Sequence, residues 1–360
     1  GIHEYYEPEE LIHLYRTFKR YLTPVHEGGY EPSIYYEGKV PVEFSCLPLS
    51  IYDNCRCEHF PTVSSMLEQY YAERNTVTRI RQKSTDLRRI VQTALERNIK
   101  KYDLQAKQLK DTEKREKYRI YGELINTYGY DVPQGSKSFQ ALNYYTSEEI
   151  TIPLDPQIPV QENATKYFDK YGKLKRTFEA VTALLKETDE EIQHLRSIQT
   201  ALDIALQEED LTQIREELME SGYIRKRPSG SKRPKITSKP FHYISSDGFH
   251  MYVGKNNLQN EELTFHFANG GDWWFHAKKA PGSHVIVKTN GEELPDRTFE
   301  EAARLAAHYS KNSGAEKVEV DYVEKKQVKK PNGSKPGFVV YYTNYSMMID
   351  SDISGIQEVQ

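Results

Sequence analysis

One short stretch of the chain, from Asp272 to His284, combines residue types that could act in catalysis or in binding. It contains both tryptophans of the protein, Trp273 and Trp274, together with His276 and a Pro-Gly turn. A histidine can act as a general base, and Asp272 could fix the tautomer of His276 from four residues away. The domain around this stretch has no cysteine nucleophile and no pair of carboxylates with an evident role. We therefore expect no catalytic residue and predict that the protein is not an enzyme.

The two histidines allow two interpretations. In one, they hydrogen-bond to the backbone of their own loop, and in the other they contact a ligand. The adjacent tryptophans would point to opposite faces of a strand, so that one belongs to the core and the other can stack on a base. Alternation does not decide which of them is exposed. The candidates for contact with RNA in this stretch are Trp274, His276, Lys278, Lys279 and His284.

Two further polar clusters flank this stretch. The first follows Gly254 and is rich in side-chain amides, and the second is a lysine-rich loop with a Pro-Asn-Gly-Ser turn and a Pro-Gly pair. Amides at turns often bond to their own backbone, and lysine-rich loops are often only solvated. Together with aromatic rings they favour contact with phosphates, 2′-hydroxyls and base edges. The candidate RNA-binding residues here are Lys255, Asn256, Asn257, Gln259, Asn260, Lys325, Lys326, Lys329, Lys330 and Lys335.

The charge of the chain is unevenly distributed. Residues 225–350 carry 20 Lys and Arg against 14 Asp and Glu, whereas residues 1–224 carry 29 against 37. A basic segment without acidic residues, 225–239, opens the basic part and is either a solvated linker or a tether that contacts phosphates. The basic share thus lies with the aromatic residues, as expected for a nucleic-acid-binding domain.

Composition narrows the class of protein. The three cysteines are too few, and odd in number, for a disulfide framework, and Cys55 and Cys57 lack a second pair for a zinc site. We expect no metal and no cofactor. No apolar run is long enough to span a bilayer and no secretory signal is present, so we expect a cytoplasmic protein. Because the chain begins without Met, we also expect further domains ahead of it.

These residues need elements that position them. Residues 1–60 have the pattern of a helix followed by a hairpin at Ser33–Phe44. Residues 61–224 contain two long runs with apolar residues at heptad spacing, separated by a proline-rich connector at about 129–162. We expect the runs to pair as an antiparallel coiled-coil hairpin with a small domain at its tip. A coiled coil between two chains is the alternative.

The C-terminal part of the chain, residues 240–350, is expected to be an α+β domain with one helix, 298–311, against a mostly antiparallel sheet. A tail, 351–360, follows it. The predicted strands are 241–244, 250–253, 263–267, 283–288, 318–323 and 337–342. The predicted fold class of the whole chain is therefore α+β, with a long helical hairpin followed by this sheet domain.

Several motifs of the C-terminal part resemble the NFACT-R domain of the RqcH/NEMF family of ribosome-associated quality-control factors, whose bacterial members are often called fibronectin/fibrinogen-binding proteins. The motifs are Ser246–Phe249, Val253–Asn260, Asp272–His276, Pro281–Ile286 and Val328–Gly337. Segments of residues 61–224 resemble the coiled-coil and middle segment of the family. Residues 5–60 resemble the closing part of its NFACT-N domain.

The resemblance implies a function and partners. Such factors recognise a large ribosomal subunit blocked by peptidyl-tRNA, hold a tRNA, and promote template-free C-terminal tailing of the stalled chain, with alanine in bacteria. Their coiled coil reaches the stalk base, and their NFACT-N and NFACT-R domains contact tRNA. Most of NFACT-N and the helix-hairpin-helix segment are absent from this sequence, so we do not expect the chain alone to support tailing.

Two other hypotheses remain at this stage. The chain could be an adhesin for fibronectin or fibrinogen displayed at the cell surface, or a homodimeric scaffold held together by the coiled coil. Contact with phosphates would give an affinity that falls steeply with salt, which distinguishes RNA binding from an adhesin. Light scattering against concentration tests the dimer.

Overall fold

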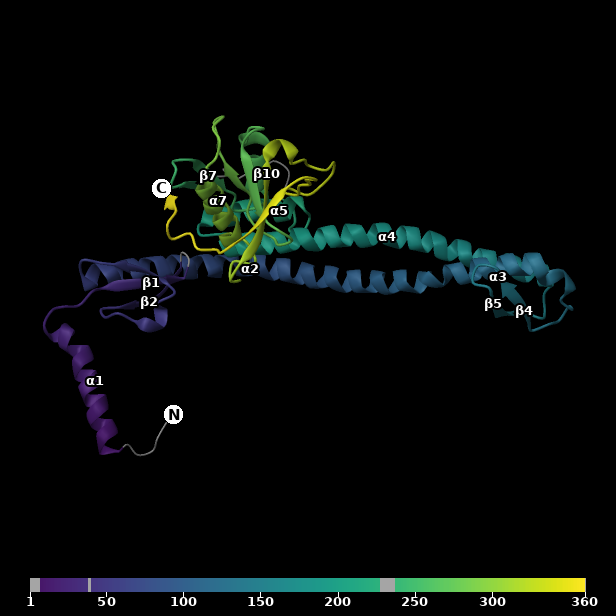
Figure 1. The fold of residues 1–360 in the computed structure, drawn as a ribbon, viewed down its shortest axis with the longest axis horizontal. Coiled ribbons are helices and arrows are strands. Elements are labelled where there is room, and N and C mark those ends of the chain that lie inside the picture. The colour runs from purple at the N-terminus through teal and green to yellow at the C-terminus, as the bar shows by residue number, and fades with distance from the viewer. Residues whose placement is uncertain (1–6, 38–39, 227–236, 360) are drawn as a thin grey trace. The chain divides into compact units, whose positions relative to one another are not determined.

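The computed structural model describes residues 7–37, 40–226 and 237–359 (Figure 1). Most of the predicted basic linker, residues 227–236, lies outside the described residues. The turn of the predicted N-terminal hairpin, at 38–39, also lies outside them.

The chain divides into two compact units. One unit is made of residues 1–89 and 200–360, and the other of residues 90–199. The two long helices cross this division, because each has one end in either unit. The division therefore does not follow the predicted boundaries at 60 and 224, which stay a prediction.

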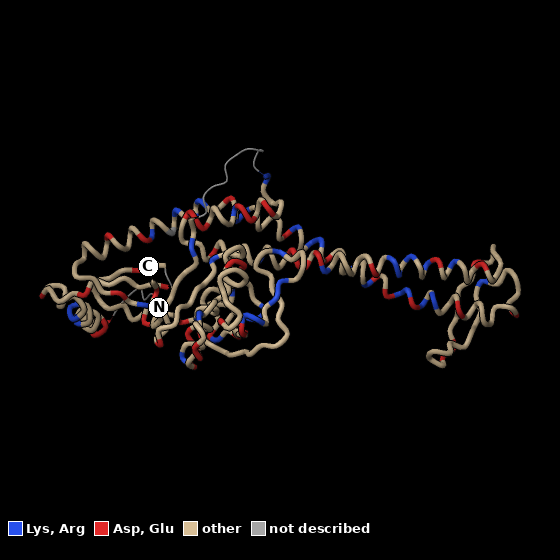
Figure 2. Tube along the Cα trace, turned by 90° about the horizontal axis from the view of Figure 1, so that it is seen from above, with Lys and Arg blue, Asp and Glu red and all other residues tan. Residues whose placement is uncertain are grey.

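The second unit is built on an antiparallel helical hairpin. Contacts between its helices join Arg115 to Phe178, with 3.9 Å from the guanidinium to the ring centre, and Gly122 to Phe168. Residue numbers rise on one helix as they fall on the other, so the two helices run in opposite directions within one chain. Lys, Arg, Asp and Glu are interspersed along both helices (Figure 2). The helices concerned are α2 (Val63–Asp111), α3 (Arg115–Tyr128) and α4 (Val160–Ile204).

A small domain lies between the two long helices in the sequence. Its hairpin, β4 (Ser138–Asn143) and β5 (Glu148–Pro153), is antiparallel, and its core includes Leu124, Ile152 and Ala164 from three elements. The predicted antiparallel hairpin with a small tip domain is therefore confirmed. The apolar seams are buried within one molecule, as the heptad pattern predicted.

The N-terminal part of the first unit is a three-stranded sheet in the order β2-β1-β3, packed on the start of α2. Its core contains Ile34 and Tyr36 from β1 together with Met66 and Tyr70 from α2. The preceding helix α1 contributes no buried residue. The bounds are Pro8–His26 for α1, Ser33–Glu37 for β1, Val40–Ser45 for β2 and Arg56–His59 for β3.

The C-terminal part of the first unit is a seven-stranded antiparallel sheet in the order β11-β10-β8-β9-β7-β6-β12. One face packs on helix α7 (Asp296–His308), whose Ala302, Ala303, Ala306 and Ala307 allow close contact. Over the other face lie α6 (Asn257–Glu262) and a π-helix, Leu263–Phe267. The strands are β6 (Phe241–Ile244), β7 (His250–Val253), β8 (Trp273–Ala277), β9 (Val285–Val287), β10 (Val318–Glu324), β11 (Tyr345–Ile349) and β12 (Gln357–Glu358).

The α+β class is confirmed, but three local predictions were wrong. Residues 263–267 form a π-helix instead of a strand, because their apolar side chains cover the sheet from above. Residues 337–342 form only an isolated bridge, between Lys329 and Val340, and the edge strand is β11. The expected tail contains β12, which pairs with β6 and extends the sheet.

Candidate nucleic-acid interface

Trp274, His276 and His284 form one aromatic cluster on the sheet. The Trp274 ring is fully buried, with ring-centre distances of 5.6 Å to His276 and 5.1 Å to His284. Its indole nitrogen has no hydrogen-bond partner among the described residues. A buried ring cannot stack on a base, so the selection of Trp274 as the contacting tryptophan has to be corrected. Trp273 is the partly exposed one, on the face that packs on α7.

The two histidines are shielded from protonation. Burial lowers the pKa of His276 to about 4, although a hydrogen bond to the backbone of Gly282 acts in the opposite direction. Burial also lowers the pKa of His284 well below its ordinary value, and His276 beside it adds to that effect. The ring of His284 is hydrogen-bonded to the Thr264 hydroxyl at 2.8 Å. Both rings are therefore neutral at pH 7, and His284 belongs to the interior.

The amide-rich cluster after Gly254 is buried as well. Its five predicted binding residues face helix α5 (Glu208–Glu220) instead of solvent. Asn256 Nδ2 donates to Gln213 Oε1 at 2.9 Å, and Asn257 Nδ2 donates to Glu217 Oε1 at 2.7 Å. The prediction that these amides contact RNA directly does not agree with this burial. The residues whose assignment to direct RNA contact is corrected are Lys255, Asn256, Asn257, Gln259 and Asn260.

An ion pair completes the contact between α5 and this cluster. The Lys255 ammonium lies 3.3 Å from Asp210 Oδ1, and both side chains are buried. Asp210 also accepts hydrogen bonds from the Ser238 hydroxyl at 2.6 Å and from the backbone N–H of Gln207 at 3.1 Å, at the start of α5. A buried charge needs such a set of partners, because desolvation would otherwise cost several kcal/mol. The cluster therefore positions the sheet domain on α5.

The position of Asn260 explains why residue 254 of this motif is a glycine. Asn260 Oδ1 accepts from the backbone N–H of His284 at 3.0 Å, and Asn260 Nδ2 donates to the carbonyl of Gly282 at 3.3 Å. A Cβ atom at Gly254 would overlap Asn260 Oδ1 and lie 3.0 Å from Asn260 N. The Asn260 amide thus joins the motif at 253–260 to the Pro-Gly turn at 281–284.

The lysine-rich loop remains at the surface. Lys330 pairs with Glu261 at 2.7 Å, Lys326 pairs with Glu324, and the Lys325 ammonium lies 5.9 Å from the centre of the Phe265 ring. Lys329 is exposed and forms no ion pair with any described residue. Lys335 is partly exposed. This loop is the predicted cluster that the structure leaves accessible.

The two lysines after the tryptophans differ from each other. Lys278 pairs with Glu319 at 2.6 Å and lies 3.6 Å from Asp321, and its pKa is raised, chiefly by the hydrogen bond to Glu319. Lys279 is exposed. Its backbone has a φ of 54°, in the left-handed region that residues other than glycine and asparagine rarely adopt. Lys279 is therefore available to an anion, whereas Lys278 is already paired.

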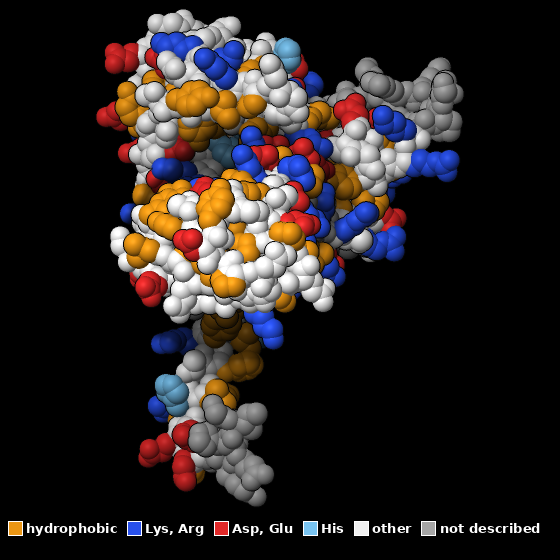
Figure 3. Space-filling model, turned by 90° about the vertical axis from the view of Figure 1, so that its right-hand side faces the viewer, with side chains coloured by type: hydrophobic (Ala, Val, Ile, Leu, Met, Phe, Trp, Pro, Cys, Tyr) orange, Lys and Arg blue, Asp and Glu red, His pale blue; other side chains and the backbone are white. Residues whose placement is uncertain are grey.

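Sequence reasoning missed the aromatic side chains next to the lysine-rich loop. Phe338, Tyr342 and Tyr345 are 42%, 86% and 61% exposed. Phe338 and Tyr342 fall within residues 337–342, for which the sequence predicts a strand, whereas Tyr345 lies beyond that range. In the space-filling view, hydrophobic side chains lie beside Lys and Arg, with Asp and Glu among them, so the visible surface has no single sign of charge (Figure 3).

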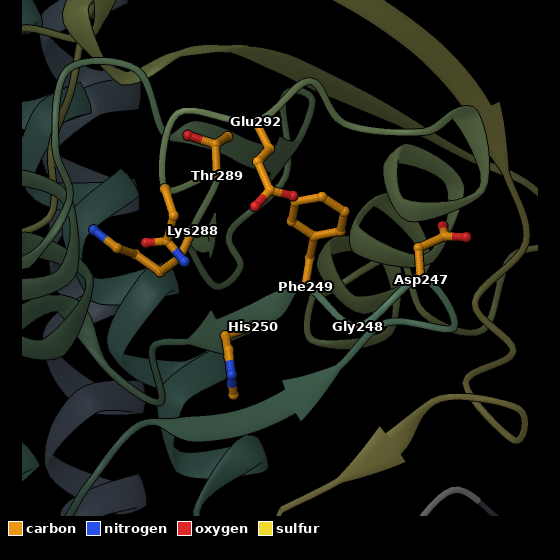
Figure 4. Close-up of a pocket in the computed structure, with 8 residues that line it drawn as sticks. Asp247, Gly248, Phe249, His250, Lys288, Thr289 and Glu292 are labelled. Atoms are coloured by element: carbon orange, nitrogen blue, oxygen red, sulfur yellow. The ribbon is translucent and has the colours of Figure 1, made fainter.

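A small pocket of about 110 Å³ lies between the start of β7 and the segment after β9. The Phe249 ring and the Glu292 carboxylate point toward each other, whereas His250 and Asp247 point away from them (Figure 4). Side chains that diverge in this way do not build a small-molecule site. The described residues also contain no group of three metal-ligating side chains and no helix that could cross a membrane.

Comparison with protein families gives two matches, which follow one another along the chain. Residues 3–237 match a model described as NFACT N-terminal and middle domains, and residues 239–342 match one described as NFACT protein RNA binding domain. The chain belongs to the NFACT family. The boundary between the two NFACT matches falls at the C-terminal end of the predicted basic linker.

Individual NFACT relatives agree with the family match. The chain is 43% identical to the "Rqc2 homolog RqcH" of Streptococcus suis over 79% of this chain and 51% of that protein. It is 37% identical to the "Rqc2 homolog RqcH" of Bacillus subtilis over 81% of this chain and 52% of that protein. The chain thus spans about half the length of these relatives.

A solved structure also resembles this chain. It is described as the C-terminal of the fibronectin/fibrinogen-binding protein from Streptococcus suis, with a TM-score of 0.62 and 37% sequence identity. The similarity covers 78% of this chain and 99% of that one. The likeness supports the described fold, and the name states only what that relative has been called.

Proposed function

We propose that the chain is part of an RqcH-like ribosome quality-control factor that binds RNA on an obstructed large ribosomal subunit. The observation that carries this proposal is the pair of NFACT matches, one of them to an RNA-binding domain, together with relatives named RqcH. The partners we propose are the large subunit, tRNA and peptidyl-tRNA. The chain itself has a binding role and no catalytic one, and it acts in the cytoplasm.

The two kinds of element suggest a division of roles. Within the second unit, the tip of the helical hairpin carries exposed Tyr130, Tyr144 and Tyr145, which suit a protein or RNA surface such as the stalk base. Within the first unit, the lysine-rich loop and Lys279 suit phosphate groups. Tailing of a stalled chain with alanine is proposed for the full-length protein, because this chain spans about half of its relatives.

The test is binding of the chain to purified large subunits that carry peptidyl-tRNA, with empty subunits and free tRNA alongside. We expect tightest binding to the loaded subunits and a steep loss of affinity as salt rises, on the order of 10³-fold between 50 and 200 mM if six phosphates are contacted. The double variant Lys329→Glu with Lys330→Glu should weaken binding by at least 10-fold.

A matched control keeps this test specific. Lys311→Glu with Lys317→Glu makes the same change of charge at exposed positions outside the lysine-rich loop, and it should bind within about two-fold of the unchanged chain. Equal loss in both double variants would show a general charge effect and contradict the assignment to the loop. Failure of the unchanged chain to bind any subunit or tRNA would contradict the function itself.

An adhesin is the second candidate, and it rests on the name of the structural relative alone. Immobilised fibronectin and fibrinogen can be included in the same binding assay. Binding to them that resists 200 mM salt, without binding to ribosomal subunits, would favour the adhesin over the RNA-binding proposal.

A further inference from the structure

The segment that follows the lysine-rich loop has two distinct sides. Val339 and Tyr341 belong to the core around the buried Trp274. Phe338 and Tyr342 are 42% and 86% exposed. The two exposed residues lie on either side of the bridged Val340, with Tyr342 at a bend of the backbone. The inward residues fix the segment on the sheet, which leaves the outward rings in a defined place.

Lys329 lies opposite the middle of this segment. The backbone N–H groups of Lys329 and Val340 each donate to the carbonyl of the other at 2.9 Å, in an antiparallel bridge. Residues directly opposite in an antiparallel pair present their side chains on the same face. Val339 and Tyr341 on either side of Val340 belong to the core, so Val340 and the exposed Lys329 side chain opposite it face outward, between the exposed Phe338 and Tyr342 in the chain.

The chemistry of this face is specific. Lys329 has no ion pair with a described residue, so its ammonium can take a phosphate without giving up a carboxylate. Tyr342 forms no hydrogen bond and no ring contact with a described residue, so both faces of its ring are open.

We propose that Phe338, Lys329 and Tyr342 form a site for unpaired nucleotides of RNA, with bases stacked on the rings and a phosphate held by the ammonium. Bases within a duplex have no free face, whereas loops and single strands do. This site adds detail to the proposed function. It depends on that function in one respect, namely that the partner is RNA. It would give the domain a preference for looped or single-stranded segments.

The test compares Phe338→Ala, Tyr342→Ala and Tyr342→Phe with the unchanged chain, using a labelled single-stranded RNA and a duplex of equal length. Tyr30→Ala is the matched control, because Tyr30 is 44% exposed and precedes β1, outside the C-terminal sheet domain. We expect the alanine variants to weaken single-strand binding roughly 5- to 100-fold and duplex binding by less than two-fold. Tyr342→Phe, which keeps the ring, should bind like the unchanged chain.

Lys329→Gln provides a second readout. It should lower the slope of log affinity against log salt by about 0.7, the amount that one phosphate contact contributes on a single strand. Tyr342→Ala should leave that slope unchanged, because stacking involves no counterion release.

Two outcomes distinguish a failure of the stacking site from a failure of RNA binding. If the unchanged chain binds single-stranded RNA and Tyr342→Ala behaves like Tyr30→Ala, the stacking site is refuted while RNA binding stands. If the unchanged chain binds neither RNA, both proposals fail, and an exposed aromatic surface for a protein partner would replace them.

Discussion

At the scale of single residues, the polar side chains that suggested RNA binding have two different fates. The amides between Lys255 and Asn260 are buried and hydrogen-bonded to α5 or to the Pro-Gly turn. The lysines from Lys325 onward remain at the surface. Both clusters contain residues suited to phosphate and base contacts, so residue type alone could not separate them. Burial decides which of them can meet a ligand.

Gly254 gives a prediction at this scale. Gly254→Ala should lower the free energy of unfolding by about 1–3 kcal/mol, because the added methyl group collides with Asn260 and forces the surrounding segment to move. Gly172→Ala is the control, since nothing lies within 4 Å of its Cβ position in helix α4. That change should raise stability by about 0.5–1 kcal/mol. Urea unfolding measures both, and equal effects would contradict the packing argument.

The histidines predict a dependence of stability on pH. The folded-state pKa of His276 is about 4, below its value near 6.5 in an unfolded chain. The unfolded chain therefore binds a proton first, and the stability present above pH 6.5 is lost as the pH falls toward 4. His276→Gln should reduce the slope of unfolding free energy against pH by up to about 1.4 kcal/mol per unit between pH 6 and 4.5.

The unchanged chain, unfolded over the same pH range, supplies the comparison for that measurement. A slope that His276→Gln leaves unchanged would show that this ring is not shielded from protons.

At the scale of elements, helix α5 carries two kinds of buried face. Leu211, Ile214 and Leu218 are apolar, whereas Asp210 and Glu217 are charged and bonded to the sheet domain. The polar residues on this face repeat every three or four positions, as the turn of a helix requires. Contacts between domains are commonly more polar than a domain core. Helix α5 therefore acts as the support on which the sheet domain is oriented.

Asp210 provides the prediction for this element. Asp210→Ala should lower the free energy of unfolding by about 3–5 kcal/mol, because it leaves the Lys255 ammonium buried without its partner and removes the cap of α5. Glu209→Ala, a neighbouring exposed acid in the same turn, should change stability by less than about 0.5 kcal/mol. Guanidinium unfolding followed by circular dichroism compares the two, and similar midpoints would refute the role given to Asp210.

At the scale of the whole molecule, the apolar seams of the long helices are buried against each other within one chain. Arg88 of α2 donates to Asp203 and to the Leu202 carbonyl of α4, each at 2.5 Å. No second copy is needed to cover these helices. Helix α1 differs, because Leu14 and Phe18 on it are largely exposed. An exposed apolar face of this kind promotes association.

We therefore predict that the chain self-associates through α1 as its concentration rises, and not through the helical hairpin. The double variant Leu14→Glu with Phe18→Glu should remain at the chain mass of 41.9 kDa throughout. Light scattering coupled to size exclusion gives the mass. A variant that still forms dimers would place the contact elsewhere, and an unchanged chain that stays monomeric at high concentration would contradict the prediction.

Much of the architecture could be predicted from the sequence, because it follows from local periodicity. Heptad spacing over two long runs specifies two helices, and the prolines between them exclude a continuous helix. Alternation located β6 and β7 at their observed bounds. It failed for 263–267, since a short apolar run fits a strand and a buried helical turn equally well.

The sequence by itself determined the fold class, the two long helices and the family, since these depend on periodic patterns and on motifs that stand in order along the chain. Only the tertiary structure decided which of the chosen polar and aromatic residues can reach a ligand. Exposure depends on what packs over a residue from distant parts of the chain, as α5 covers Asn256 and Asn257 and as Val339 and Tyr341 pack on Trp274. No pattern within a local window carries that information.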